Sequence, residues 1–144
     1  MHEVARSIID AELKLGRRLD QIKADPLAFE RKILFQKIEI ESRLPCKEIV
    51  FLDRAVPDSI AYFRVEGLDP SEPLSKSLSM RYRNVFILDR LGFAKDPVRS
   101  EDDGLALHID VLLEKGYRRL GYEIIRVPVL SVKARVDYIL QRIY

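Results

Sequence analysis

Two short apolar runs, each followed by Asp-Arg, constrain the fold of this chain most strongly. The first run is Ile49–Leu52, followed by Asp53, and the second is Val85–Leu88, followed by Asp89. Four continuous apolar residues are too few for an amphipathic helix and are typical of a parallel strand buried on both faces. Tyr122–Val127 reads as a third strand, and helical patterns separate all three. The sequence therefore predicts an α/β fold built on a parallel sheet.

Capping residues mark the ends of several predicted helices. Asp25 precedes Pro26, which is the arrangement of an N-cap followed by proline at the first helical position, and that helix is expected to end near Leu44. A shorter helix is predicted from Pro57 to about Val65, closed by Gly67. Further helices are predicted over Glu3–Leu15, Leu74–Tyr82, a stretch opened by Ser100 and Asp103 that ends at Leu120, and a last stretch capped by Ser131.

Composition narrows the class of protein. With 144 residues, 47% hydrophobic and 33% charged, the chain suits a single domain over residues 1–144 with no second domain. A formal net charge of +2 lacks the strong basic excess of nucleic-acid-binding proteins. The apolar runs are far shorter than a membrane span, no signal segment opens the chain, and Cys46 has no partner for a disulfide. We expect a cytoplasmic protein that binds neither nucleic acid nor membrane.

The acids that follow the apolar runs are the first candidates for chemistry. In open parallel sheets, ligands bind outside the carboxyl ends of the strands. A carboxylate at such an end resembles a Walker B acid, which positions Mg²⁺ on nucleotide phosphates. This interpretation is favoured for Asp53, because Arg54, Asp58 and Ser59 follow it around one expected opening. For Asp58 a catalytic role and a favourable interaction with the helix dipole are equally supported; for Asp89, capping of the next turn is favoured.

A charged loop follows the second apolar run. It carries Arg90, Lys95 and Arg99 among several acidic residues. Arginines on a loop can close over transferring phosphates, because their planar guanidinium groups match phosphate oxygens. From the residues alone, the interpretation as a solvated charged loop is slightly favoured over a role in phosphate transfer.

Four blocks in order along the chain resemble a known family. They are Glu3–Arg6, Phe51–Tyr62, Arg99–Asp102, and the tail that runs from Gly121–Glu123 to Val127–Val129. Together they are similar to the predicted AAA-type ATPases related to the ribosylnicotinamide kinase domain, within the P-loop nucleotide kinase group. The resemblance implies a three-layer fold with a five-stranded parallel sheet between helices. It also implies a protein that binds ATP with Mg²⁺ and either phosphorylates a small-molecule acceptor or hydrolyses ATP.

The same resemblance assigns roles to individual residues. Asp53 corresponds to the Walker B-type acid, with a catalytic role and contact to the metal. Arg99 corresponds to the catalytic arginine of the lid. The residues expected on the acceptor side are Glu3, Arg6, Arg54 and Asp58. Those expected on the nucleotide side are Arg90 and Pro128, the latter in a loop near the adenine.

One departure from the family pattern bears on activity. None of the six glycines belongs to a GxxxxGK[ST] motif, so the phosphate-binding Walker A loop is absent from these residues. We expect that a strand–loop–helix unit of roughly 30 residues is missing before Met1, leaving an incomplete sheet, little ATP turnover and a homo-oligomer. The alternative is a non-catalytic interaction or regulatory protein that keeps the fold and self-associates.

Overall fold

The chain is divided into two compact units. A computed structural model describes residues 4–90 and 103–144. The first unit is Met1–Met80 and the second is Arg81–Tyr144. The single domain expected over residues 1–144 stays a prediction.

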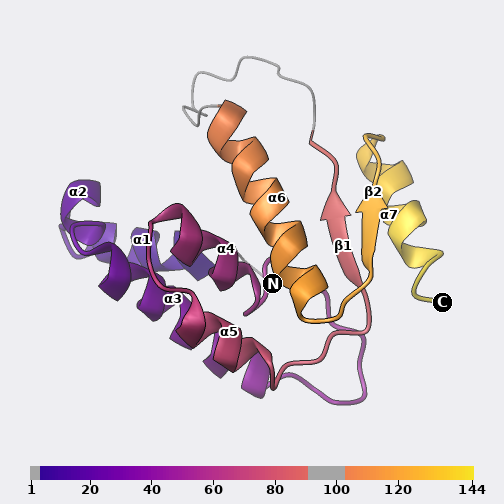
Figure 1. Ribbon diagram of the computed structural model, residues 1–144, viewed down its shortest axis with the longest axis horizontal. Helices are drawn as coiled ribbons and strands as arrows, with labels where there is room; N and C mark the ends of the chain where they lie inside the picture. The colour runs from indigo at the N-terminus through magenta and orange to yellow at the C-terminus, as the bar shows by residue number, and fades with distance from the viewer. Residues whose placement is uncertain (1–3, 91–102) are drawn as a thin grey trace. The chain divides into compact units, whose positions relative to one another are not determined.

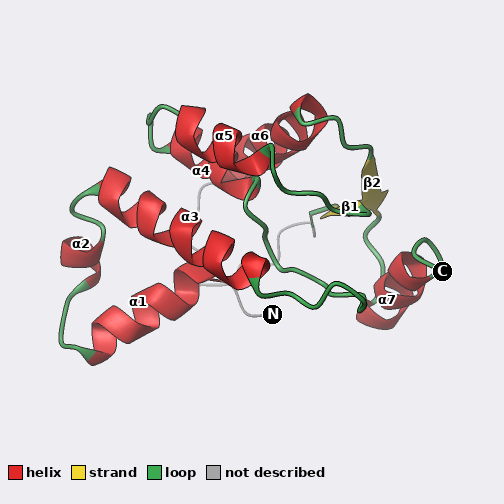
Figure 2. Cartoon of the chain, turned by 90° about the horizontal axis from the view of Figure 1, so that it is seen from below, coloured by secondary structure: helices red, strands yellow, loops and turns green. Residues whose placement is uncertain are grey.

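The described part of the first unit is helical. Its helices are α1 (Val4–Lys14), α2 (Leu19–Ile22), α3 (Pro26–Ser42), α4 (Asp58–Val65) and α5 (Ser71–Ser77). Helix α3 packs against both α1 and α4, and α4 packs against α5. Figure 2 shows α1 and α3 side by side, with the short α2 in the connection between them. Helix α2 was not predicted, and α5 begins a few residues before the predicted helix at Leu74.

The predicted caps of this unit are confirmed. The Asp25 carboxylate accepts a hydrogen bond of 3.0 Å from the amide of Ala28, which satisfies one of the free N–H groups at the start of α3. After α4, Gly67 has φ of +69°, and the Leu68 amide donates a 2.7 Å bond to the Phe63 carbonyl. A residue with left-handed backbone followed by this bond is a common helix ending, and glycine adopts that conformation at the least steric cost.

Two apolar clusters form the core of the first unit. One joins α1 to α3 through Val4, Ile8 and Ile33, and the other joins α3 to the segment 56–63 through Leu34, Val56 and Phe63. Because Ile33 and Leu34 are neighbours on α3, they face different partners, and α3 is buried on two sides. The second cluster lies directly beneath the segment that follows Asp53.

The described part of the second unit is a parallel pair of strands with two helices. Strand β1 (Val85–Leu88) pairs with β2 (Ile124–Val127), with Val85 opposite Ile124. Helices α6 (Asp103–Arg119) and α7 (Val132–Leu140) both pack against β2, and Figure 1 shows the two strands side by side. Both segments were predicted as strands of a parallel sheet, and their parallel direction is confirmed, whereas their pairing with each other was not predicted. The cap of α7 is also confirmed, because the Ser131 hydroxyl accepts a 3.3 Å bond from the Ala134 amide.

The predicted strand at Ile49–Leu52 is wrong. In the described residues the sheet has the two strands β1 and β2, and the segment from Ile49 to Leu52 belongs to no strand. Its side chains were expected to be buried, but Ile49 is 48% exposed and Phe51 is 51% exposed. A strand needs a neighbour for its backbone N–H and C=O groups, and no strand of the described residues pairs with this one. The five-stranded, three-layer arrangement is likewise not seen there.

No helix in the described ranges is long and apolar enough to span a bilayer. The loop predicted between Arg90 and Arg99 lies, beyond its first residue, outside the described residues, as does the capping role of Ser100.

Candidate functional site

A tight turn at Asp53 and Arg54 lies where the sequence predicts a metal-binding acid. Asp53 is exposed, and Arg54 has φ of +64°. A non-glycine residue in this left-handed region costs roughly 1–2 kcal/mol, so the surrounding structure must hold it. Part of that support comes from Tyr62 on α4, since the Arg54 guanidinium carbon lies 5.1 Å from the centre of the Tyr62 ring.

Two carboxylates fix the backbone immediately after the turn. The Ala55 amide donates a 2.9 Å hydrogen bond to Asp58 Oδ2, and the Val56 amide donates a 2.8 Å bond to Glu41 Oε1. Bonds from amides to ionised carboxylates are stronger than neutral ones. The segment that carries Asp53 is therefore tied to both α4, through Asp58, and α3, through Glu41.

This geometry changes the interpretation of two residues expected at an opening. Asp58 is a buried residue, with its carboxylate bonded inside the turn, and Ser59 is fully buried. Neither therefore lies at an open mouth. The acceptor-side role that the resemblance implies for Asp58 stays a prediction, and the structure gives its carboxylate a role in holding the turn.

A buried lysine lies behind the turn. Lys37 on α3 is 4% exposed, and its Nζ donates a 3.4 Å hydrogen bond to the Ser59 hydroxyl. Burial lowers the pKa of Lys37, while the negative charges of Asp58, Glu30 and Glu41 act in the opposite direction. Sequence analysis missed this residue, because a charged side chain within a helical pattern is normally assigned to the solvent face.

The remaining predicted site residues are spread over the chain. Arg6 is exposed on α1, Arg90 is exposed after β1, and Pro128 is half-buried after β2. Glu3 and Arg99 lie outside the described residues. Of the described candidates, the structure brings together Asp53, Arg54 and Asp58 in one turn, while Arg6 belongs to another helix of the same unit.

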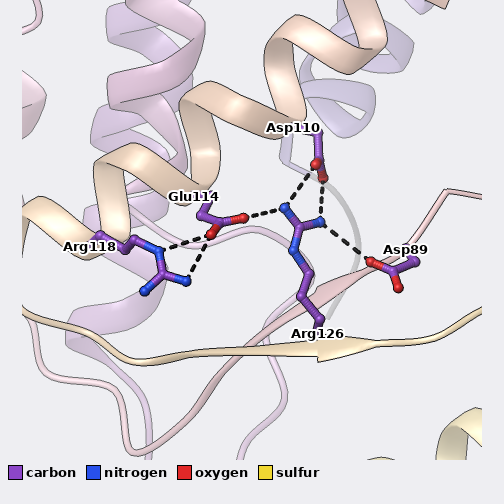
Figure 3. Close-up of polar contacts among 5 residues, drawn as sticks. All are labelled: Asp89, Asp110, Glu114, Arg118 and Arg126. Carbon is purple, nitrogen blue, oxygen red and sulfur yellow. Dashed lines mark hydrogen bonds and ion pairs between the residues drawn. The ribbon is translucent and has the colours of Figure 1, made fainter.

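The second unit contains a network of charged side chains centred on Arg126. Arg126 on β2 makes two bonds to the Asp110 carboxylate, at 3.1 and 3.0 Å, and also contacts Glu114; both acids come from α6. Figure 3 shows the Arg126 guanidinium between these two acids and Asp89, whose carboxylate is 3.6 Å away. Arg118 holds Glu114 from the other side at 2.9 Å.

This network accounts for Asp89, the acid after the second apolar run. Its carboxylate is paired with Arg126 and its amide donates a 2.8 Å bond to the Val127 carbonyl. The hydrogen bonds that Arg126 donates to Asp110 and Glu114 raise the pKa of Arg126 further above its already high value. Asp89 thus contributes to the cohesion of the second unit, and the capping of the next turn stays a prediction, because the residues after Arg90 lie outside the described part of the chain.

Replacing Arg126 with methionine should lower the unfolding free energy of the Arg81–Tyr144 unit by about 1–2 kcal/mol, a figure reduced for solvent screening of this half-buried group. The loss follows because three carboxylates would then face one another without their shared cation. Arg118→Met, which removes one exposed partner of Glu114, should cost less than about 0.5 kcal/mol. Urea unfolding followed at individual amides by NMR measures both.

The effect of Arg126→Met should depend on pH. Hydrogen bonds from Arg126 and then Arg118 lower the pKa of Glu114 below its ordinary 4.5. A carboxyl whose pKa is lowered by folding adds stability above its unfolded pKa, and that stability is lost as the pH falls through the folded value. The difference between the native protein and Arg126→Met should therefore shrink below pH 4.5; a difference that stays constant down to about pH 3 would contradict this assignment.

Two further features bear on ligand binding: a groove on α3 and the clustering of metal-binding side chains. A groove of about 610 Å³ runs along α3 and is lined by Lys32, Phe35, Gln36, Glu39, Ile40 and Arg43. None of the predicted site residues lines it. Among residues 4–90 and 103–144, no group of three or more His, Cys, Asp or Glu side chains is placed to hold a metal ion. A metal at Asp53 would therefore need most of its ligands from water and from the phosphates of a nucleotide.

Comparison with known proteins identifies the class of protein. A parallel strand pair with helices packed against it is consistent with an α/β domain of the P-loop type. Residues 1–135 match the model of a family described as AAA domain, and the chain belongs to that family. No curated protein and no solved structure matches the chain.

Proposed function

We propose that this protein is a nucleotide-binding domain in which the Asp53 carboxylate contacts Mg²⁺ on the phosphates of ATP. Membership of the AAA domain family supports nucleotide as the ligand. The observation that carries the proposal is the fixed turn, in which an exposed carboxylate follows an apolar run and its backbone is tied down by Asp58 and Glu41. A hard cation takes oxygen ligands, and a carboxylate on a fixed backbone is held ready for it.

The finer proposal is an ATP-dependent kinase or ATPase of the P-loop kinase-like group, related to ribosylnicotinamide kinases. Bound Mg²⁺ would offset the negative charge of the phosphates. Arg6, Arg54 and Glu3 would orient a small-molecule acceptor, and Arg99 would contact the transferring phosphoryl group. We expect low turnover from these 144 residues, because they contain no GxxxxGK[ST] motif to surround the phosphates with backbone N–H groups.

A chemical-shift titration with Mg²⁺–ATP tests the proposal. NMR detects weak binding, and amide signals of residues 53–56 should move and saturate in the native protein. Asp53→Asn, which keeps the shape and removes the charge, should weaken the apparent affinity by about tenfold or more. Asp89→Asn is the matched control, because that acid is already paired with Arg126. Equal affinities of the native protein and Asp53→Asn would refute the role of Asp53.

A second function has its own supporting observation. Ile49, Val50 and Phe51 form an exposed apolar run that belongs to no strand of the described residues. Contiguous exposed apolar side chains mark surfaces that associate with another chain. We therefore carry forward a non-catalytic protein that self-associates through this run as the alternative.

A further inference from the structure

One row of side chains on helix α3 combines three charged residues with the buried Leu34. Glu30, Leu34, Lys37 and Glu41 recur at spacings of four, three and four, which places them in one row along a helix. Leu34 packs against Val56 and Phe63, so this row faces the segment that includes α4. Glu30 and Lys37 are both buried beside it. Buried charges are costly unless they are paired, so a charged row on this face requires an explanation.

The row reaches the backbone of the candidate site. At one end, Glu41 accepts the bond from the Val56 amide. In the middle of the row, the Lys37 ammonium group donates a hydrogen bond to the Ser59 hydroxyl. The neighbouring residue, Asp58, accepts the bond from the Ala55 amide. Both amides follow the strained Arg54. The buried Lys37 is therefore bonded to the residue next to one of the two carboxylates and lies one helical turn from the other.

We propose that Lys37 is a positioning residue for the turn that carries Asp53. Its ammonium group bonds to Ser59 beside Asp58 and lies one helical turn from Glu41, so its positive charge stabilises the two carboxylates that accept the bonds from the Ala55 and Val56 amides. Lys37 does not contact a ligand in this role; it acts through the two carboxylates. The inference rests on the proposed function in one respect: fixing the turn matters for activity only if Asp53 binds the metal.

The charges that act on Lys37 support this reading. They are Glu30 and Glu41 from α3, Asp58 from α4 and Arg54 from the turn. The three acids favour the charged form of the lysine, whereas burial and Arg54 disfavour it. Burial also raises the pKa of Glu30, and the positive charge of Lys37 opposes that rise. Removing the charge of Lys37 would therefore take one favourable interaction away from each of these acids.

Amide hydrogen exchange in the ligand-free protein tests the inference. In Lys37→Met, which keeps the chain length and removes the charge, protection at Ala55 and Val56 should fall by about tenfold or more relative to Phe63 in α4. Lys37→Arg keeps the charge and should recover most of that protection. Lys32→Met is the matched control, because Lys32 lies on the same helix and pairs at the surface with Glu12; it should leave Ala55 and Val56 unchanged.

A merely structural lysine would give a different pattern. If Lys37 only fills space in the core, protection at Ala55, Val56 and Phe63 would fall together in Lys37→Met, and Lys37→Arg would not recover the first two selectively. Either result would overturn the inference. The hydrogen-exchange measurement uses no nucleotide. If Asp53 does not bind Mg²⁺–ATP, the inference about Lys37 is therefore unaffected.

If Lys37→Met does not fold, a pH titration of the native protein tests the same inference. The ε-carbon signal of Lys37 reports loss of its proton as the pH is raised, and carbon-detected signals of Ala55 and Val56 report the turn. The inference requires the three to change together with one midpoint. Backbone signals that stay constant while Lys37 titrates would contradict it.

Discussion

Replacing Phe63 with alanine should lower the unfolding free energy of the Met1–Met80 unit by about 3–5 kcal/mol. Phe63 is 1% exposed and packs with Leu34 and Val56 in the cluster beneath the turn. Removing its ring takes away buried apolar surface and leaves a cavity that the surrounding helices can only partly fill. A loss of this size is a large part of the whole stability of a small folded unit.

The matched control is Phe35→Ala on α3. Phe35 is 45% exposed, so the same substitution should change stability by no more than about 0.5 kcal/mol. Urea unfolding observed at individual amides separates the two units. A loss below about 1 kcal/mol for Phe63→Ala would show that the core lies elsewhere. Because Phe63 packs on Val56, exchange at the Val56 amide should also increase in this variant.

Self-association through Ile49–Leu52 should be abolished by Val50→Lys. Antiparallel pairing of this run with a second copy, centred on Val50, would place Lys47 of each copy opposite Asp53 of the other, which is a favourable pairing of charges. Val50 is 37% exposed, and a lysine there would bring two like charges together at the centre of the contact. Light scattering should show the native chain as a dimer or larger and the variant as a monomer.

Leu15→Lys is the control for this experiment, because Leu15 is also exposed but lies at the end of α1. It should leave the assembly unchanged. A native chain that is a clean monomer would count against pairing at this run, as would an assembly that survives Val50→Lys. Such pairing would cover the residues next to Asp53, so a self-associated form should also bind Mg²⁺–ATP less readily than the Val50→Lys monomer.

Local signals in the sequence were sufficient for most helix ends and for two strands. Asp25 with Pro26, Gly67 and Ser131 act through contacts with residues close in sequence, and the structure confirms each of them. The helix ends therefore need no information about distant parts of the chain. The apolar patterns of Val85–Leu88 and β2 indicate two strands of a parallel sheet, but their pairing with each other joins distant segments and was not predicted.

The features that could not be predicted depend on distant partners. The run Ile49–Leu52 has the pattern of a buried strand, but a strand also requires a neighbour, and its sequence does not say whether one is present. The sequence predicts the end of a strand at Asp53, and the left-handed conformation of Arg54 carries no sequence signal, since arginine has no preference for that conformation. Lys37 and Glu41 were missed because their burial depends on what packs against α3.

Paramagnetic broadening by Mn²⁺–ATP tests the central claim most directly. Mn²⁺ takes oxygen ligands as Mg²⁺ does, and it broadens the signals of nearby amides even when binding is weak. The amides of Asp53, Arg54 and Ala55 should lose intensity first, and Asp53→Asn should remove that selectivity. Broadening that is uniform along the chain, or centred on Asp110 and Glu114 in the second unit, would contradict the placement of the nucleotide's metal at Asp53.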